Sequence, residues 1–255
     1  MRKIILTLFA VSYVLSAQGC MSFVSDSFQI PNNRFQSSET SGGLGDGLIA
    51  AGYGNKTMAI LTHPTAANDQ DVINSSKVNA HEGMYLQASA GLHQKVDFLF
   101  YNGAMGLKLQ AVGAPASEAK AGNRSLSLGL AVDRGSSSST NYNKKSQVEY
   151  SGVDAMIIAG YRIKDSQLIY ANIASSSFSA SGSLTTESGS GTTAVTSTIL
   201  KGPRRDVRET SLLVGWQGLN ERVFVMLEAG YTIANMQGKN SARGLSLGGS
   251  FGARW

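Results

Sequence analysis

Apolar and polar residues alternate along most of this chain with a period of two, which in a β-strand places one set of side chains on each face of a sheet. Nine segments show the alternation, within residues 84–90, 96–100, 105–111, 126–132, 153–161, 169–173, 212–216, 223–233 and 245–255. A tenth lies within residues 44–62, as one strand or as a hairpin. The pattern predicts an all-β, antiparallel fold of about 10 strands, with a range of roughly 8 to 12.

The face opposite the apolar one carries small polar residues and charges of both signs. The charged members are Asp97, Lys108, Asp133, Asp154, Arg162, Glu228 and Arg254. Alternation alone does not say which face is inside, because a soluble barrel encloses its apolar face and a membrane barrel turns it to lipid. Side chains about fill a barrel of this size, so paired charges closing the interior are expected. Small residues such as Gly160 and Gly248 leave a narrow water path as the alternative.

The connections between the predicted strands alternate in length. Residues 92–95, 164–166 and 219–221 are short connections, with 114–123 a longer exception on the same side. Long connections fall at residues 63–80, 135–147 and 179–205, and Asn102-Gly103 is a tight turn on that side. Short connections on one side and long ones on the other are typical of outer-membrane barrels.

The last predicted strand, GLSLGGSFGARW, ends the chain on an aromatic residue. In this segment the chain resembles bacterial outer-membrane β-barrels, whose final strand commonly ends in Phe or Trp. The resemblance implies an up-and-down transmembrane β-barrel over residues 44–255, located in the bacterial outer membrane. It also implies that Phe251 and Trp255 form the signal read by the barrel-insertion machinery. Closure satisfies every backbone group within lipid and leaves no free edge.

The first residues, MRKIILTLFAVSYVLSAQGC, have the layout of a secretory signal peptide over residues 1–19. The apolar run from Ile4 to Leu15 is shorter than the roughly 20 residues of a spanning helix. The SAQGC segment resembles the lipobox of bacterial lipoproteins, although Ala17 replaces the usual leucine, and this resemblance implies acylation of Cys20. The same stretch also suits ordinary signal peptidase. Since Cys20 is the single cysteine, the fold has no intramolecular disulfide.

Residues 20–43 are polar and rich in serine. We interpret them as a polar N-terminal tether on the periplasmic side or as an arm that plugs the barrel. Disorder is the default expectation for such a composition.

Four basic residues gather beside the longest connection: Lys201, Arg204, Arg205 and Arg208. Guanidinium groups pair with phosphates through two hydrogen bonds, so this cluster is a candidate contact for lipopolysaccharide head groups. Solvated charges that balance Asp206 and Glu209 are the alternative. Removal of Arg2 and Lys3 with the signal lowers the formal net charge from +5 to +3, which does not indicate a nucleic-acid binder.

No catalytic motif occurs in the structural context that its chemistry needs. The G-x-S-x-G pattern occurs at residues 244–248 and 248–252, but inside the last predicted strand and not at a strand-to-helix turn, so it forms no nucleophile elbow. His63 and His81 are too far apart for a tight metal-ligand pair. We therefore predict a non-enzymatic outer-membrane β-barrel with a structural or surface-interaction role and no metal or cofactor. Its expected partners are outer-membrane lipids, lipopolysaccharide and, during biogenesis, the barrel-insertion machinery. The alternatives are a periplasmic lipoprotein whose soluble barrel binds an apolar ligand, and a narrow, porin-like passive channel.

Overall fold

The computed structural model describes residues 24–63, 76–141, 144–188, 196–201, 204–220, 222–236 and 240–255. The strands are β1 (Val24–Pro31), β2 (Gly47–His63), β3 (Lys77–His93), β4 (Val96–Tyr101), β5 (Ala104–Val112), β6 (Arg124–Asn141), β7 (Lys144–Lys164), β8 (Gln167–Ser188), β9 (Thr196–Lys201), β10 (Arg205–Leu219), β11 (Val223–Met236) and β12 (Asn240–Arg254). Over these ranges, no helix is long and apolar enough to cross a membrane.

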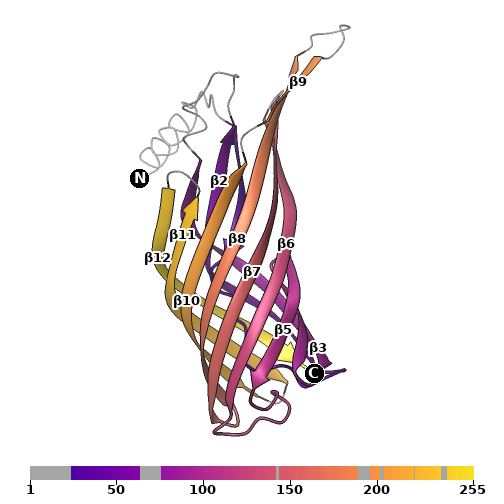
Figure 1. The fold of residues 1–255 in the computed structure, drawn as a ribbon, viewed down its shortest axis with the longest axis vertical. Helices are drawn as coiled ribbons and strands as arrows, with labels where there is room; N and C mark the ends of the chain where they lie inside the picture. Colours follow the sequence, from indigo (N-terminus) through magenta and orange to yellow (C-terminus); the bar gives the residue numbers. More distant parts are fainter. Residues whose placement is uncertain are drawn as a thin grey trace, which may run out of the picture.

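In the described part of the chain, ten strands form a closed antiparallel barrel (Figure 1). Each wall strand pairs with the next one along the chain, with β8 followed by β10, and β2 closes the ring by pairing with both β3 and β12. The predicted all-β, up-and-down architecture is therefore confirmed. The segment at residues 44–62, for which two readings were open, forms a single wall strand.

The two ends of the barrel differ in their connections. At one end, here called the turn end, residues 94–95, 165–166 and 220–222 make short connections and residues 113–123 a longer one. The C-terminus also lies there, where the backbones of Gly47 and Trp255 exchange two hydrogen bonds of 3.1 and 3.2 Å. At the opposite end, here called the hairpin end, β6, β7 and β8 extend beyond β10, β11 and β12, and β9 pairs with the end of β8 (Figure 1). The two ends therefore differ as predicted, but the described part of the hairpin end is built from long strands where long loops were expected.

Two of the predicted long connections are strands over much of their length. For the low-complexity stretch at residues 179–198, a flexible exposed loop and a long β-extension of a hairpin were both open, and the structure has the second. Within residues 135–147, β6 continues to Asn141 and β7 begins at Lys144. Within residues 179–205, β8 continues to Ser188 and pairs there with β9. Ser- and Thr-rich strands with water on the outside have no apolar outer face, so period-two alternation does not reveal them. The Asn102-Gly103 turn is as predicted, with φ values of 50° and 99° that fit the favoured two-residue hairpin.

The apolar face of the wall points outward in the part of the barrel nearer the turn end. This apolar belt comprises Ile49, Leu86, Leu107, Leu109, Leu128, Leu130, Val132, Val153, Ile157, Ile169, Ile173, Leu212, Val214, Val225, Leu227, Leu245, Leu247 and Phe251, each between 39 % and 74 % exposed. The charged residues of the same strands point into the lumen, where Asp97, Lys108 and Glu228 are almost fully buried.

The alternation inverts along the same strands toward the hairpin end. On β7, outward Val153 and Ile157 give way to outward Ser151 and Glu149, while inward Asp154 gives way to inward Val148. Strands β6, β8 and β10 switch at comparable heights, with Arg134, Ser175 and Thr210 the first polar outward residues. Inside the hairpin end, an apolar cluster of Phe28, Ile30, Val148, Phe178, Val207 and Met236 fills the lumen. The barrel thus has a lipid-type exterior in one part and a water-type exterior in the other.

Candidate functional site: the occupied lumen

The lumen holds the segment before the first wall strand. Residues 24–43, here called the arm, enter at the hairpin end, where Val24 pairs with His63, and reach the turn end before Gly47. Every residue from 32 to 40 is buried. This arrangement matches the plug-like arm and differs from the disordered periplasmic tether. The physical reason is that lumen side chains satisfy the arm's polar groups, which offsets the entropy lost on ordering.

The arm's first part is a strand that replaces β12 at the barrel seam. Strand β12 pairs with β2 only along residues 48–54 of β2, and β1 pairs with residues 56–63. On β1, Phe28 stacks on Tyr150 with ring centroids 4.6 Å apart, and its ring centroid lies 5.9 Å from that of Phe178. The hairpin end of the lumen is therefore closed by a packed aromatic group.

Arg34 of the arm lies at mid-lumen and is fully buried. Its guanidinium donates to both carboxylate oxygens of Asp154, at 2.8 and 3.0 Å. Further hydrogen bonds reach the hydroxyls of Ser176 (2.8 Å) and Ser211 (2.9 Å) and the backbone carbonyl of Asn32 (2.9 Å). Glu209 lies 3.5 Å from the same group. One arm side chain thus joins β7, β8 and β10 across the lumen.

Glu228 of β11 is the second carboxylate satisfied mainly by the arm. It accepts hydrogen bonds from the backbone N–H of Arg34 at 3.0 Å and from the Asn33 amide at 3.4 Å. The hydroxyl of Tyr170 on β8 donates to it at 2.9 Å, across Gly215 of the intervening strand β10. Burial of a carboxylate costs less free energy when neutral groups donate hydrogen bonds to it than when it has no donors. The arm therefore stabilises the buried charge of Glu228 through neutral donors.

Closer to the turn end, a wall ion pair grips the arm's backbone. Lys108 lies 3.2 Å from Asp97 on the neighbouring strand, and its ammonium donates to the carbonyl of Glu39 at 2.8 Å. Asp97 in turn accepts the backbone N–H of Ser41 at 3.0 Å. The expected pairing of Asp97 and Lys108 is confirmed, and both partners also bind the arm.

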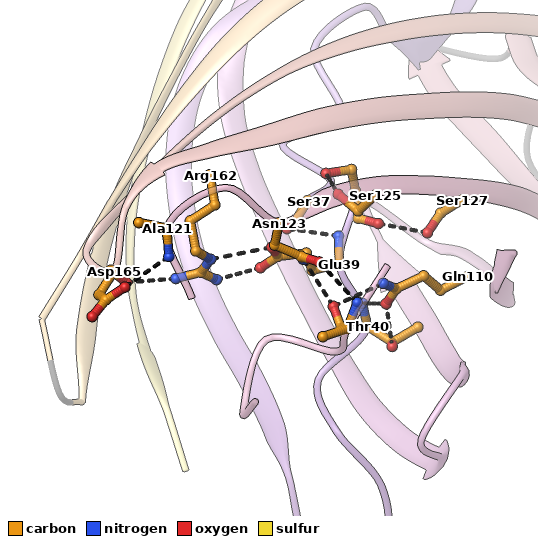
Figure 2. A network of polar contacts seen from close by, with 12 residues as sticks. Ser37, Glu39, Thr40, Gln110, Ala121, Asn123, Ser125, Ser127, Arg162 and Asp165 are labelled. Atoms are coloured by element: carbon orange, nitrogen blue, oxygen red, sulfur yellow. Dashed lines mark hydrogen bonds and ion pairs between the residues drawn. The ribbon is translucent and has the colours of Figure 1, made fainter. Parts of the chain in front are cut away.

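A second polar layer holds Glu39, as Figure 2 shows. Arg162 of β7 forms an ion pair with Glu39, and the Asn123 amide donates to the same carboxylate at 2.8 Å. Beside it, the backbone N–H of Thr40 donates to Gln110 at 2.7 Å. Figure 2 also shows wall serines directed toward the arm; Ser125 lies 2.7 Å from the Ser38 hydroxyl. The layer fixes four consecutive residue positions of the arm against three wall strands.

Lumen glycines make space for the arm where a water path was the alternative. A Cβ on Gly160 would overlap the Ser38 hydroxyl and lie 2.9 Å from the Ser38 Cβ. A Cβ on Gly248 would lie 2.7 Å from the Phe35 ring and 3.0 Å from Asn33. These glycines are therefore contact points for the arm. Sequence reasoning missed Arg34 and Glu39 as lumen residues. The available signal was that charged residues are few in this polar segment, where Asp26 is the only other one.

A cavity of about 560 Å³ opens at the turn end, below the arm's last buried residues. Its lining includes apolar Leu48, Phe224 and Trp255 together with Arg222 and Arg254. The cavity ends at the Glu39 layer, which separates it from the rest of the lumen.

The predicted basic cluster does not converge on one point. Lys201, Arg204 and Arg208 are exposed near the hairpin end, while Arg205 is half-buried. Arg204 pairs with Asp206 at 3.7 Å, so part of its charge is balanced locally. Arg208 points outward just beyond the apolar belt, between Ser177 and Asn235 of the neighbouring strands.

The remaining predicted residues are placed as follows. Phe251 and Trp255 point outward from the last strand and are 61 % and 62 % exposed. Aromatic residues near strand ends can lie at the membrane–water interface if they face outward. Tyr161 and Tyr231 point outward, whereas Tyr101 is buried in the lumen and donates to Asp154 at 2.7 Å.

The predicted signal peptide and Cys20 lie outside the described residues. Within the ranges that the structure covers, no group of three or more His, Cys, Asp or Glu side chains is placed to hold a metal.

Comparisons with known proteins assign neither a family nor a function. No protein-family model matches the chain, and no curated protein matches it. Among solved structures, the crystal structure of Ail, the attachment invasion locus protein of Yersinia pestis, aligns with 83 % of this chain and 99 % of that one, at 11 % identity and a TM-score of 0.34. A likeness of this strength says nothing about what this chain binds.

Proposed function

We propose that the protein is an outer-membrane β-barrel with a closed lumen that holds β-hairpins at the bacterial cell surface, in a structural or surface-interaction role without enzymatic activity. The inverted alternation of the wall carries this proposal. Apolar side chains face outward around the belt, where charges fill the interior, and the reverse holds above it. A soluble barrel has water around its whole length and gains nothing from an exposed apolar belt, whereas a bilayer requires one.

The contents of the lumen favour a closed barrel over a channel. Arg34 and Glu39 lie on the lumen axis with partners on several walls, and the Phe28 stack closes the hairpin end. The same contents disfavour the alternative of a soluble barrel for an apolar ligand, because Phe28, Ile30 and Phe35 of the arm already pack among the buried apolar residues of the lumen. We expect no stable conductance steps in planar bilayers. Reproducible steps from the intact protein would contradict the closed lumen.

The hairpin strands support a surface role. A strand of about 9–11 residues crosses a bilayer, whereas β7 has 21 residues and β8 has 22. Roughly half of each strand therefore projects beyond the belt, with polar residues on its outer side. A rigid paired hairpin presents such residues to external partners at lower entropic cost than a flexible loop.

The outward Arg208 is the strongest of the predicted lipopolysaccharide contacts. It stands where the apolar belt ends, and with the belt taken as the membrane-spanning part this is the height expected for lipid head-group phosphates. We expect Arg208→Ala to weaken binding of purified lipopolysaccharide by about tenfold, the effect of losing one charge-assisted pair. The control is Arg124→Ala, an exposed arginine at the turn end. Equal binding by both variants and the wild type would remove Arg208 from the site.

The proposal also includes two processing signals: the aromatic residues of the last strand, for barrel insertion, and Cys20, for acylation. Phe251 and Trp255 face outward at the end of the strand that closes the barrel, a position accessible to the barrel-insertion machinery before closure. Acylation of Cys20 is part of the proposal too, and metabolic labelling with a fatty acid tests it. Incorporation that persists in a Cys20→Ser variant would contradict acylation at this residue.

Fractionation with gel mobility tests the membrane location itself. A closed membrane barrel resists detergent until it is heated, so we expect the protein in the outer-membrane fraction with different mobility before and after boiling. A folded protein that stays soluble in the periplasmic fraction without detergent would contradict the proposal and favour the soluble lipoprotein.

A further inference from the structure

We propose that the amino-terminal end of the mature chain emerges on the outer surface of the cell, although the carboxyl-terminal end lies on the periplasmic side. The inference rests on the proposed function, since it takes the apolar belt as the membrane-spanning part and the hairpin end as external. It follows from the direction in which the arm passes through the barrel.

The arm's direction is fixed at both ends by backbone pairing. At the hairpin end, β1 runs antiparallel to β2, so Val24 lies beside His63 while Pro31 lies deeper, beside Lys56. At the turn end, the N–H of Ala116 donates to the carbonyl of Thr40 at 2.8 Å, in the long connection between β5 and β6. The chain therefore runs inward through the lumen from the hairpin end and then turns back as β2.

Side-chain contacts at successive depths hold the arm along its whole path. Phe28 packs at the hairpin end, Arg34 binds Asp154 at mid-lumen, and Glu39 pairs with Arg162 toward the turn end. Each contact joins the arm to a strand on the far side of the barrel from β2. A reversed or withdrawn arm would leave the buried charges of Asp154 and Arg162 without these partners.

The predicted cleavage after Gly19 would leave too short a length of chain before β1 to return to the periplasm. With the signal peptide removed after Gly19, four residues precede Val24. Four extended residues reach at most about 14 Å. The apolar band of an outer-membrane barrel is about 25 Å tall. The amino-terminal end therefore stays on the side where β1 begins.

The seam between β2 and β12 explains how such threading arises. Strand β2 is both the continuation of the arm and one side of the closing seam. If β1 pairs with residues 56–63 of β2 before β12 pairs with residues 48–54, closure of the seam encloses the arm. No passage of the chain through a finished barrel is needed.

Epitope insertion tests the topology in whole cells. One epitope is placed between Met21 and Ser22, a second at residues 142–143 between β6 and β7, and a third between Asn220 and Glu221 in a short turn. We expect antibody to bind the first and second epitopes on intact cells, and the third only after permeabilisation. An amino-terminal epitope that needs permeabilisation, with the second one accessible, overturns the inference. An inaccessible second epitope contradicts the proposed membrane orientation instead.

A cysteine pair tests the threading without reference to the membrane. In a Cys20→Ser background, Ser38→Cys with Ser125→Cys joins hydroxyl positions 2.7 Å apart in the arm and the wall. We expect a disulfide that changes mobility on a non-reducing gel. The control pair, Ser38→Cys with Ser211→Cys, should stay reduced, because Ser211 contacts Arg34, four residues away along the arm. Equal cross-linking of both pairs, or none in the first pair of a folded barrel, would contradict the arm's position.

Discussion

Replacing Arg34 by Met removes the arm's central cation while keeping a side chain of similar length. The change leaves Glu209 without the cation that lies 3.5 Å from it. It also takes two hydrogen bonds from Asp154, one from Ser176 and one from Ser211. The guanidinium is the only cation that the described structure pairs with Asp154 or Glu209.

The loss of stability expected for Arg34→Met depends on the hydrogen bonds that its former partners keep. Breaking a buried ion pair by removing one partner costs about 3–5 kcal/mol. Asp154 retains the hydroxyls of Tyr101 at 2.7 Å and Ser176 at 2.8 Å, so its charge is still hydrogen-bonded. We therefore expect the low end of the range, about 3 kcal/mol, which lowers the folding equilibrium constant roughly a hundredfold.

Urea unfolding of the protein in lipid vesicles, followed by tryptophan fluorescence, measures this change. The matched control is Arg124→Met, which makes the same replacement at an exposed position and should change the free energy of unfolding by less than about 0.5 kcal/mol. Adding Asp154→Asn and Glu209→Gln to Arg34→Met should restore part of the stability, because no buried charge is then left unpaired. If Arg34→Met is no more costly than the control, Arg34 does not hold the arm in the lumen as described.

Two further predictions concern the belt and the fit of the arm. Leu130→Arg, in the belt, should lower the stability of the vesicle-inserted barrel by about 2–4 kcal/mol. Ser136→Arg, outward on the same strand beyond the belt, should be nearly neutral. Similar effects of the two changes in unfolding titrations would place the belt outside the bilayer. Gly160→Val should lower the stability by about 1–3 kcal/mol through overlap with Ser38. Gly244→Val is the control, because its Cβ would meet no atom within 4 Å, and it should cost little stability. Thermal unfolding compares the two variants, and an equal loss of stability would count against a filled lumen.

The sequence by itself determined the strands of the wall. Period-two alternation places Leu128, Leu130 and Val132 on one face whatever surrounds the sheet, because successive side chains of a strand point in opposite directions. Likewise, Asn102-Gly103 specifies its turn locally, through two residues that tolerate positive φ. Wall strands, their order and the short connections between them were predictable for these local reasons.

The tertiary structure alone decided where the arm lies and how the lumen is closed. Asn33, Arg34 and Glu39 have no apolar periodicity, and their partners, such as Glu228 and Arg162, lie more than 100 residues away. A polar segment is read as disordered when its hydrogen-bonding partners are unknown, and only the closed barrel brings those partners together. The tertiary structure also decided that the apolar face points outward. Alternation is the same whichever face is inside, and only the contents of the lumen show which face that is.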